Sequence, residues 1–354
     1  MLVAVVRHHM VASKYLGIGG SELVALEIAI ALKKLGIKVY FDTLVNRKNI
    51  YSVLPSMASF YGIPLDDVVG IGLGDPDEKD LIFNASGDVL SGPADVIYLH
   101  FPAFEKVDTY YTGLKGPEKL AGTLYSFINR MLYRIGFRQY IEILTNSSFT
   151  ARFVKRYTGR EPIVVHPPVN TSRFPKTPIP IDYREKYILV VSRFSPEKGI
   201  EKAPLIMKNL VRRGSKLSIV LAGAIGKYGK KVIDNTVELA TKLGVDDKIE
   251  IVVNPSREKL IKLYSTAYAY LHLMPREHFG ISIVEAMAAG TPTIIPRESG
   301  AWIDIANKNL EYAIPYTSIE EAVEALLKLE NNNICLLYTS DAADELDGVD
   351  LGGR

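Results

Sequence analysis

The feature that constrains the fold most is an alternation of short apolar segments with longer amphipathic ones along most of the chain. The apolar segments have the length and pattern of buried strands, and the amphipathic segments have helical periodicity. Alternation of this kind predicts parallel sheets covered by helices, the α/β class. Strands are expected at residues 1–7, 38–43, 96–100, 141–146, 187–191, 217–222, 249–253 and 268–274. Helices are expected at residues 21–35, 119–137, 200–213, 231–243, 257–267, 281–289 and 319–329.

A cluster of five prolines interrupts this alternation between Pro167 and Pro180. Proline sustains neither a helix interior nor a central strand, so the cluster marks a connector. We therefore expect an N-terminal Rossmann-like domain at residues 1–168, a linker at 169–184 and a C-terminal Rossmann-like domain at 185–330. A chain of 354 residues is long enough for two such domains, which would face each other across a cleft.

Composition excludes several other classes of protein. The content of 47% hydrophobic and 23% charged residues is ordinary for a globular protein. No apolar run reaches the roughly 18 to 20 residues that cross a bilayer. The first run ends at Arg7, which is unlike a secretory signal, so a cytoplasmic location is expected. The single cysteine excludes a disulfide framework, and a net charge of +2 argues against a nucleic-acid partner.

Residues 331–354 differ in character from the rest of the chain. The run from Cys335 to Glu345 resembles translated sequencing-adaptor sequence and lacks the amphipathic pattern of the preceding helix. We expect this segment to be a non-native tail that does not take part in the fold.

The turn between the first strand and the first helix, Gly17–Glu22, is rich in glycine. Backbone N–H groups of Gly19, Gly20 and Ser21 at a helix start favour a phosphate. A dinucleotide fingerprint would need a third glycine where Glu22 stands. Asp42 at the end of the second strand keeps a dehydrogenase open as an alternative, and a simple loop is another.

The segment Val191–Gly199 follows the first strand of the second domain. Ligands of parallel sheets lie at the carboxyl ends of the strands. Arg193 and Lys198 would therefore point into the cleft, where two cations suit a diphosphate. The alternative is that both are solvated surface charges.

The segment Leu271–Gly290 carries two acids eight positions apart, Glu277 in a strand-to-helix turn and Glu285 on the following helix. The helix start between them favours a diphosphate. Glu285 stands among apolar residues, where a buried acid without a partner costs several kcal/mol. Ribose hydroxyls would supply the partners, and a surface glutamate is the alternative.

Together, this acid pair, the S-R-F-S-P-E-K-G segment and the G-G-S-E turn resemble the retaining nucleotide-sugar glycosyltransferases of family 4. The segments Thr145–Arg152 and His166–Phe174 are similar to those that lead into the interdomain linker of this family. The resemblance extends over residues 1 to about 330. It implies the GT-B fold, in which two Rossmann-like domains face a cleft.

The resemblance also implies roles for individual residues. Glu277 would contact hydroxyls of the transferred sugar, and Glu285 the ribose. The helix start at Gly280 and Ile281 would face the diphosphate, and His100 would line the sugar pocket. Arg193 and Lys198 would stabilise the departing diphosphate, so neither a cofactor nor a metal is expected.

Within the family, the similarity is greatest to mannosyltransferases that extend lipid-linked oligosaccharides. The segments Tyr98–Pro102, Leu124–Ile128 and Leu271–Gly280 carry it. It implies GDP-mannose as donor and a glycan or polyprenyl-linked glycan as acceptor. A non-catalytic nucleotide-sugar binding protein and a GT-B epimerase or phosphorylase stay open as alternatives.

A basic region lies between residues 120 and 160, where seven cations face a single acid, Glu142. The cations are Arg130, Arg134, Arg138, Arg152, Lys155, Arg156 and Arg160. The first three recur every four residues, near one face of the expected helix at 119–137, and alternate with aromatic and aliphatic side chains. This pattern predicts peripheral binding to an anionic membrane surface, on its inner face. The alternative is an ordinary helix packed on the sheet with a solvated basic side.

Overall fold

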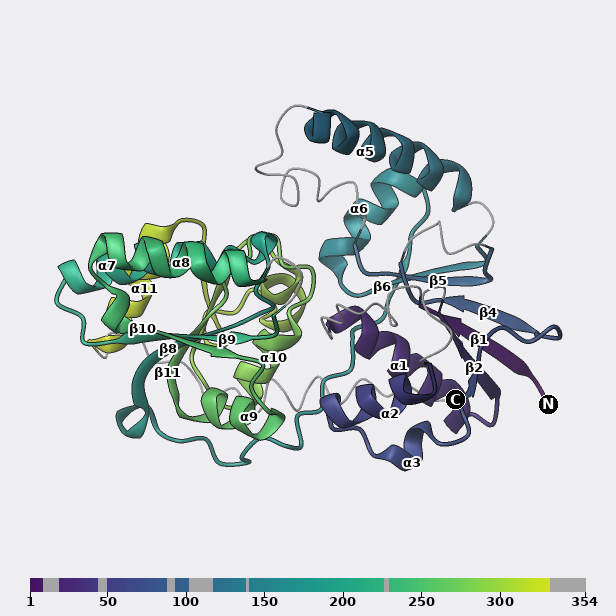
Figure 1. Cartoon of the computed structure of the whole chain (residues 1–354), viewed down its shortest axis with the longest axis horizontal. Coiled ribbons are helices and arrows are strands. Elements are labelled where there is room, and N and C mark those ends of the chain that lie inside the picture. The colour runs from purple at the N-terminus through teal and green to yellow at the C-terminus, as the bar shows by residue number, and fades with distance from the viewer. Residues whose placement is uncertain are drawn as a thin grey trace. The chain divides into compact units, whose positions relative to one another are not determined.

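The computed structural model describes residues 1–8, 19–43, 50–87, 93–101, 117–137, 140–225 and 229–331. It divides into two compact units, Met1–Pro168 and Val169–Arg354 (Figure 1). The residues beyond 331, which contain nearly all of the expected tail, lie outside the described part of the chain.

The first unit is built on a seven-stranded parallel sheet in the order β3-β2-β1-β4-β5-β6-β7. Its strands are β1 (Val3–Arg7), β2 (Lys38–Asp42), β3 (Gly72–Leu73), β4 (Leu81–Asn84), β5 (Val96–Leu99), β6 (Glu142–Thr145) and β7 (Ile163–Val164). The central strand β1 pairs on both sides, with Val5 opposite Tyr40 of β2 and Ile82 of β4. The carboxyl ends of these strands therefore share one edge of the sheet.

Helices of the first unit are α1 (Gly20–Lys34), α2 (Ile50–Tyr61), α3 (Leu65–Val68), α5 (Pro117–Gly136) and α6 (Ser148–Thr158). Helices α1, α2 and α3 bury an apolar face with Phe41 and Phe83 of the sheet. Helix α1 starts one residue before the expected Ser21, with Gly19 at the cap position. The Glu22 side chain accepts from the Gly19 N–H, which makes Gly19 the cap of the helix.

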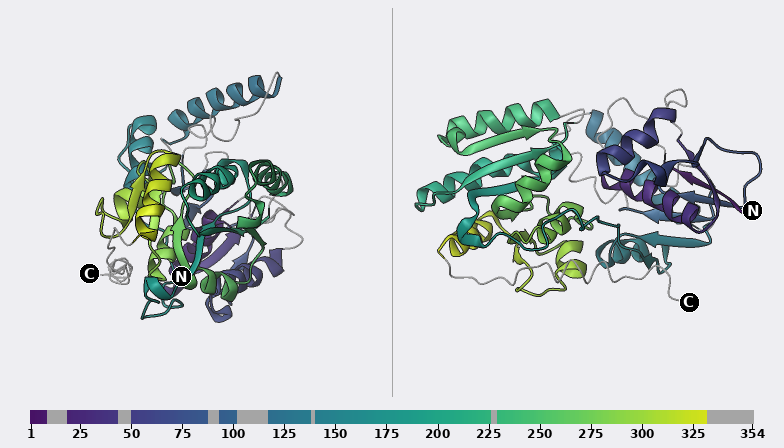
Figure 2. Two further views of the ribbon diagram at one scale, coloured as in Figure 1. Left: turned by 90° about the vertical axis from the view of Figure 1, so that its left-hand side faces the viewer. Right: turned by 90° about the horizontal axis from the view of Figure 1, so that it is seen from below.

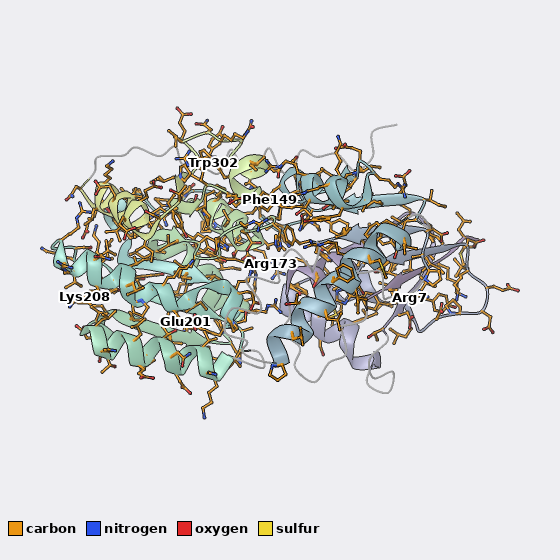
Figure 3. The ribbon with its side chains drawn as sticks, turned by 90° about the horizontal axis from the view of Figure 1, so that it is seen from above. Arg7, Phe149, Arg173, Glu201, Lys208 and Trp302 are labelled. Carbon is orange, nitrogen blue, oxygen red and sulfur yellow. The ribbon has the colours of Figure 1, made fainter. Side chains whose placement is uncertain are left out.

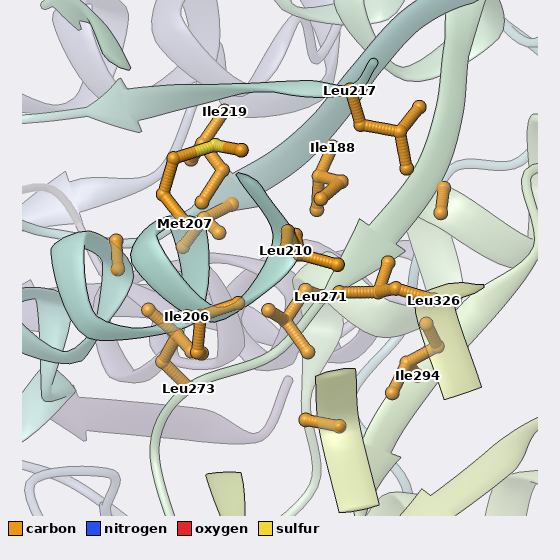
Figure 4. Packing of buried hydrophobic residues seen from close by; sticks show 14 of the residues in the cluster. Ile188, Ile206, Met207, Leu210, Leu217, Ile219, Leu271, Leu273, Ile294 and Leu326 are labelled. Atoms are coloured by element: carbon orange, nitrogen blue, oxygen red, sulfur yellow. The ribbon is translucent and has the colours of Figure 1, made fainter. Parts of the chain in front are cut away.

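The second unit has a six-stranded parallel sheet in the order β10-β9-β8-β11-β12-β13. Its strands are β8 (Glu185–Val191), β9 (Ser218–Gly223), β10 (Ile249–Val253), β11 (Ala267–Leu271), β12 (Thr293–Pro296) and β13 (Ile314–Tyr316). Every residue of β11 is buried, because helices cover both faces of the sheet. Figure 4 shows the packing on one face, where Ile206 and Met207 meet Ile188 and Leu271.

Helices on one face of this sheet are α7 (Ala203–Arg212), α8 (Gly229–Leu243) and α11 (Ile319–Glu330). Helices α9 (Arg257–Thr266) and α10 (Ile281–Ala288) cover the other face. Figure 2 shows both layers. Shorter turns of 3-10 helix lie at Ile181–Tyr183, Pro196–Lys198, Ile200–Lys202 and Asp246–Lys248. A π-helical turn at Ala301–Ile305 buries Trp302, the only tryptophan of the chain (Figure 3).

Two expected elements are shorter than predicted. The expected strand at 268–274 ends at Leu271, and residues 272–280 form a loop that carries Glu277. The α-helical part of the expected helix at 200–213 starts only at Ala203, after a turn of 3-10 helix. The strands β4, β12 and β13 and the edge strands β3 and β7 were not predicted, since each spans only two to four residues.

Arg184 is the buried polar side chain that ties the connector to the second unit, alongside the apolar packing of Phe174. The five N–H groups of the guanidinium are shared among six acceptors at 2.8 to 3.3 Å, five of them backbone carbonyls. The acceptors are the carbonyls of Ile179, Ser265, Ala267, Ala289 and Gly290 and the hydroxyl of Thr291. Four of these carbonyls lie at the carboxyl ends of α9 and α10, where helices leave acceptors unpaired and favour a cation.

The described helices include none that is long and apolar enough to cross a membrane.

Candidate functional site

The carboxyl edge of the second sheet gathers the site residues that the sequence placed in this unit. Arg193 and Lys198 lie in the loop after β8, and Glu277 in the loop after β11. Gly280 and Ile281 begin α10, and Glu285 lies farther along the same helix. Loops that follow parallel strands meet at this edge because all the strands run in one direction.

Glu277 is the most constrained acid of the site. Its side chain is 11% exposed, and its Oε2 lies 3.3 Å from Lys198 Nζ and 3.0 Å from His272 Nε2. The backbone N–H of His278 donates to Oε1 at 3.0 Å. Burial acts to raise the pKa of Glu277, but Lys198 and His272 outweigh it and hold the pKa well below its ordinary value. Glu277 is therefore an ionised acceptor, suited to bind hydroxyl groups.

His272 is a site residue that the sequence prediction missed. It is buried, and its Nε2–H donates to the Glu277 carboxylate, because an ionised carboxylate only accepts. Its Nδ1 lies 3.0 Å from the hydroxyl of Tyr270, which in turn donates to Ser282 Oγ at 2.8 Å. The signal was a lone histidine at the end of an apolar strand, which by itself does not distinguish a site residue from a core histidine.

Three cations occupy the loop after β8. Lys198 contacts Glu277, while Arg193 is 41% exposed and lies 4.0 Å from the buried Glu197. Lys202, which was not predicted, lies 3.4 Å from the carbonyl of Leu273, and burial lowers its pKa. The loop thus brings positive charge to the sheet edge beside an ionised acid.

Helix α10 begins at this edge in a backbone conformation that requires glycine. Gly280 has φ of +97°, and a Cβ there would come within 2.6 Å of Ile283 Cδ1. Its carbonyl accepts the N–H groups of Ile283 and Val284, so the chain turns directly into the helix. The first turn at Ile281 therefore presents backbone N–H groups and the positive end of the helix dipole at the site.

Glu285 is buried, so the alternative of a surface glutamate is wrong. Its partner in this structure is Arg257, the first residue of α9, whose Nη1 lies 2.6 Å from Oε1. The expected need of this acid for a partner is met by a side chain that the sequence prediction did not name. Tyr264 packs beside the pair, and burial together with the Glu285 charge raises its pKa well above the ordinary value.

The site residues predicted in the first unit are Gly19, Gly20 and Ser21 at the start of α1 and His100 after β5. The Gly19 N–H donates to Glu22 Oε2 at 3.2 Å, and the Ser21 hydroxyl donates to the same oxygen at 2.8 Å. His100 follows β5, and its Nε2 contacts the carbonyl of Ala85 at 3.0 Å, which fixes the proton on that nitrogen. Gly17 and Ile18 of the glycine-rich turn lie outside the described residues.

The carboxyl edge of the first sheet also carries buried charge. Arg7 (Figure 3) lies 3.4 Å from both Asp42 and Asp75 and donates to the carbonyl of Pro93. Asp42, on which a dehydrogenase would depend, thus has an arginine as its neighbour. His8 is buried directly after β1.

Each unit is a parallel α/β fold of the Rossmann type, and the second carries a cationic, acid-containing site at the carboxyl edge of its sheet. The expected pair of Rossmann-like domains is confirmed. Residues 174–345 match the family model of the glycosyl transferases group 1. The match covers the second unit from Phe174 onward and runs beyond Glu330, the end of α11.

Two curated relatives are GDP-Man:Man(3)GlcNAc(2)-PP-Dol alpha-1,2-mannosyltransferases. The mouse protein is 30% identical over 176 residues, which is 46% of this chain and 35% of the relative. The Caenorhabditis elegans protein is 26% identical over 270 residues, which is 68% of this chain and 57% of the relative. The chain therefore spans about a third to just over half the length of these relatives.

A solved structure with the same fold is Anabaena HepE in complex with UDP-glucose. It aligns with a TM-score of 0.68 at 17% identity, over 98% of this chain and 95% of that one. This likeness extends through both units and is one of fold.

Proposed function

We propose that the protein transfers a hexose from a nucleotide-diphosphate sugar to a glycan acceptor, with the second unit as the donor site. The observation that carries this proposal is the buried, ionised Glu277 held by Lys198 at 3.3 Å, beside the start of α10. The carboxylate suits the sugar hydroxyls, and the cations suit the diphosphate. The family match over the same residues supports this assignment.

The residues act on the charges that transfer creates. The bond from the anomeric carbon to the diphosphate oxygen breaks, so the sugar ring becomes positive and the diphosphate negative. Lys198, Arg193 and the first turn of α10 stabilise that negative charge more as it grows. The acceptor hydroxyl bonds to the anomeric carbon, and its proton passes to an oxygen of the departing diphosphate. We propose retention of the anomeric configuration and no metal, since these cations supply the positive charge.

The donor we propose is GDP-mannose. The names of the two curated relatives support mannose and a polyprenyl-linked acceptor. Calorimetric titration with GDP, UDP and ADP sugars tests the donor, and incubation with glycan acceptors tests transfer. Preference for GDP-mannose with a mannosylated product is the expected result. Binding without any product supports the non-catalytic alternative, and an epimer or sugar phosphate formed without acceptor supports an epimerase or phosphorylase.

Replacing Arg193 or Lys198 by alanine is expected to weaken donor binding by about 10- to 150-fold. Each change removes a charge-assisted hydrogen bond to the diphosphate worth about 1.5 to 3 kcal/mol. Titration calorimetry with GDP-mannose measures the change. Arg213→Ala is the matched control, because Arg213 pairs with Glu324 elsewhere in the unit. Native affinity in both site variants would remove the diphosphate assignment.

Helix α5 supports a membrane-borne acceptor, because it carries an exposed apolar stripe near basic residues. It lies beside α6 (Figure 1), and its apolar stripe is open to solvent, with Leu120 73%, Phe127 66% and Ile135 63% exposed. The other exposed members of the stripe are Leu124, Ile128 and Met131. The spacing of these six residues puts them on one face. Among the described side chains of α5, this exposed apolar face supports membrane binding over packing of the same face on the sheet.

The basic residues near this stripe whose side chains the structure describes divide into two groups, while Arg138 and the side chain of Arg134 lie outside that description. Arg130 on α5 and the α6 residues Arg152, Lys155 and Arg156 are exposed. Arg160 instead donates to the carbonyls of Phe137, Tyr140 and Ile141, so it belongs to the fold rather than to the surface. We propose that the apolar stripe enters the headgroup region of an anionic membrane while the exposed cations contact the lipid charges.

Vesicle co-sedimentation tests this surface. The protein is expected to bind vesicles with 30% anionic lipid at low salt, and the double variant Leu124→Gln/Phe127→Gln is expected to bind about tenfold less. The matched control is Leu205→Gln/Val211→Gln on α7, which changes two apolar residues that are both 39% exposed. Equal binding by wild type and α5 variant, or no binding at all, would contradict the membrane proposal.

A further inference from the structure

The ion pair between Glu285 and Arg257 joins two elements that lie far apart in the sequence. Glu285 comes from α10 and Arg257 from the start of α9. Arg257 Nη1 and Glu285 Oε1 lie 2.6 Å apart. Both side chains are largely buried, with 10% and 17% exposed. The Arg257 guanidinium lies over the ring of Phe174, 5.9 Å from its centroid. The carboxylate is thus held from one side by a cation that is itself fixed on an aromatic ring.

Arg257 occupies a position that is unfavourable for a cation. It is the first residue of α9, where the helix dipole places partial positive charge. Its buried Nε has no hydrogen-bond partner within the described part of the chain. A residue selected for stability alone would avoid both penalties, and an apolar pair of similar size fills a buried site as well as an ion pair does. Both costs are explained if the role of the Arg257 charge is to hold the Glu285 carboxylate in place.

A carboxylate has acceptor sites for about four hydrogen bonds. Arg257 donates to Oε1 of Glu285. This contact fixes the plane of the carboxylate and so the direction in which the lone pairs of Oε2 point. Two neighbouring hydroxyls of a ribose are donors that a fixed carboxylate binds together. A carboxylate free to rotate would lose this arrangement, because each donor requires a particular direction.

We infer that Arg257 is a positioning residue that orients Glu285 for the ribose diol of the donor nucleotide. This inference rests on the proposed function, since it concerns the nucleoside part of the same donor site. Arg257 acts through Glu285 and makes no contact with the reacting sugar. Replacing Arg257 is therefore expected to reduce the preference of the protein for a nucleotide with a ribose over one with a 2′,3′-dideoxyribose.

Titration calorimetry with GDP and with 2′,3′-dideoxy-GDP tests this role. In the wild type, loss of the two hydroxyls is expected to weaken binding by about 10- to 100-fold, as for two lost hydrogen bonds to a charged group. In Arg257→Met, the ratio of the Kd for 2′,3′-dideoxy-GDP to the Kd for GDP is expected to fall to about threefold or less. Arg257→Lys is expected to recover part of the ratio, because a lysine keeps the charge but lacks the planar fork. Arg213→Met, on the surface of the same unit, is the control.

The outcomes separate the two proposals. If the wild type binds neither GDP nor UDP, the donor assignment fails and this inference fails with it. If the wild type discriminates the hydroxyls and a folded Arg257→Met keeps the full ratio, only this inference is overturned. Circular dichroism establishes folding for each variant. Should Arg257→Met unfold, Arg257→Lys carries the test, and an undiminished ratio in that variant overturns the inference.

Discussion

Replacing Glu277 by glutamine is expected to lower kcat/KM for glycosyl transfer by about 10²- to 10³-fold. Glutamine keeps the shape of the side chain but removes the charge that faces Lys198 and His272. The amide also offers only one oxygen to the sugar hydroxyls. A loss of this size corresponds to removal of one strong, preorganised electrostatic contact in a water-excluded site. Initial rates with GDP-mannose and a glycan acceptor measure it.

The control for this change is Glu298→Gln, at an acid that is 72% exposed after β12. It is expected to leave the rate unchanged. Because the pKa of Glu277 is held well below its ordinary value, the carboxylate stays ionised throughout the neutral range. The factor by which Glu277→Gln lowers kcat/KM should therefore be constant between about pH 6 and pH 8. A variant with more than half of the wild-type rate would refute the role given to Glu277.

Replacing Arg184 by methionine is expected to lower the free energy of unfolding of the second unit by about 3 to 5 kcal/mol. Methionine fills most of the volume but leaves several buried carbonyls at the ends of α9 and α10 without a donor. Each unsatisfied buried acceptor costs about 1 to 3 kcal/mol, less where the structure relaxes. Thermal unfolding followed by circular dichroism should show a midpoint lower by about 10 °C.

Lysine at this position is not expected to restore stability. A single ammonium group has three donors and cannot reach acceptors on two helices and the connector together. Arg213→Met, which removes a half-exposed surface arginine, is expected to change the midpoint by less than about 2 °C. Unfolding of Arg184→Met within that same narrow range would mean that the connector is held by packing alone.

The sequence predicted the fold well where strands are buried on both faces. The run Ala267–Leu271 is apolar throughout, and it is a central strand. The short edge strands β3 and β7 escaped prediction, because two residues carry no periodicity. Helix α5 was predicted within two residues of its bounds, but its pattern could not tell whether the apolar face meets protein or solvent. That choice depends on neighbours distant in sequence.

The site was predicted only as far as its residues follow strands. Arg193, Lys198 and Glu277 were expected at one sheet edge because parallel strands bring their carboxyl ends together, and they lie in the loops after β8 and β11. His272 and Arg257 were missed, because each matters only through a partner on another element. The start of α1 shows a similar limit. Both Gly19 and Ser21 suit a cap, and the contact from Glu22 to the Gly19 N–H decides between them.

The single tryptophan makes the second unit optically distinct from the first. Trp302 is buried in the π-helical turn, and its backbone N–H donates to Ser299 Oγ. Gly300, two residues before Trp302, donates its N–H to the carbonyl of Glu277 at 2.8 Å. The indole of Trp302 is therefore fixed on the same segment that contacts the backbone of the site residue Glu277. Fluorescence excited at about 295 nm therefore reports on this half of the chain without a label, so its unfolding can be followed separately from that of the tyrosine-containing first half.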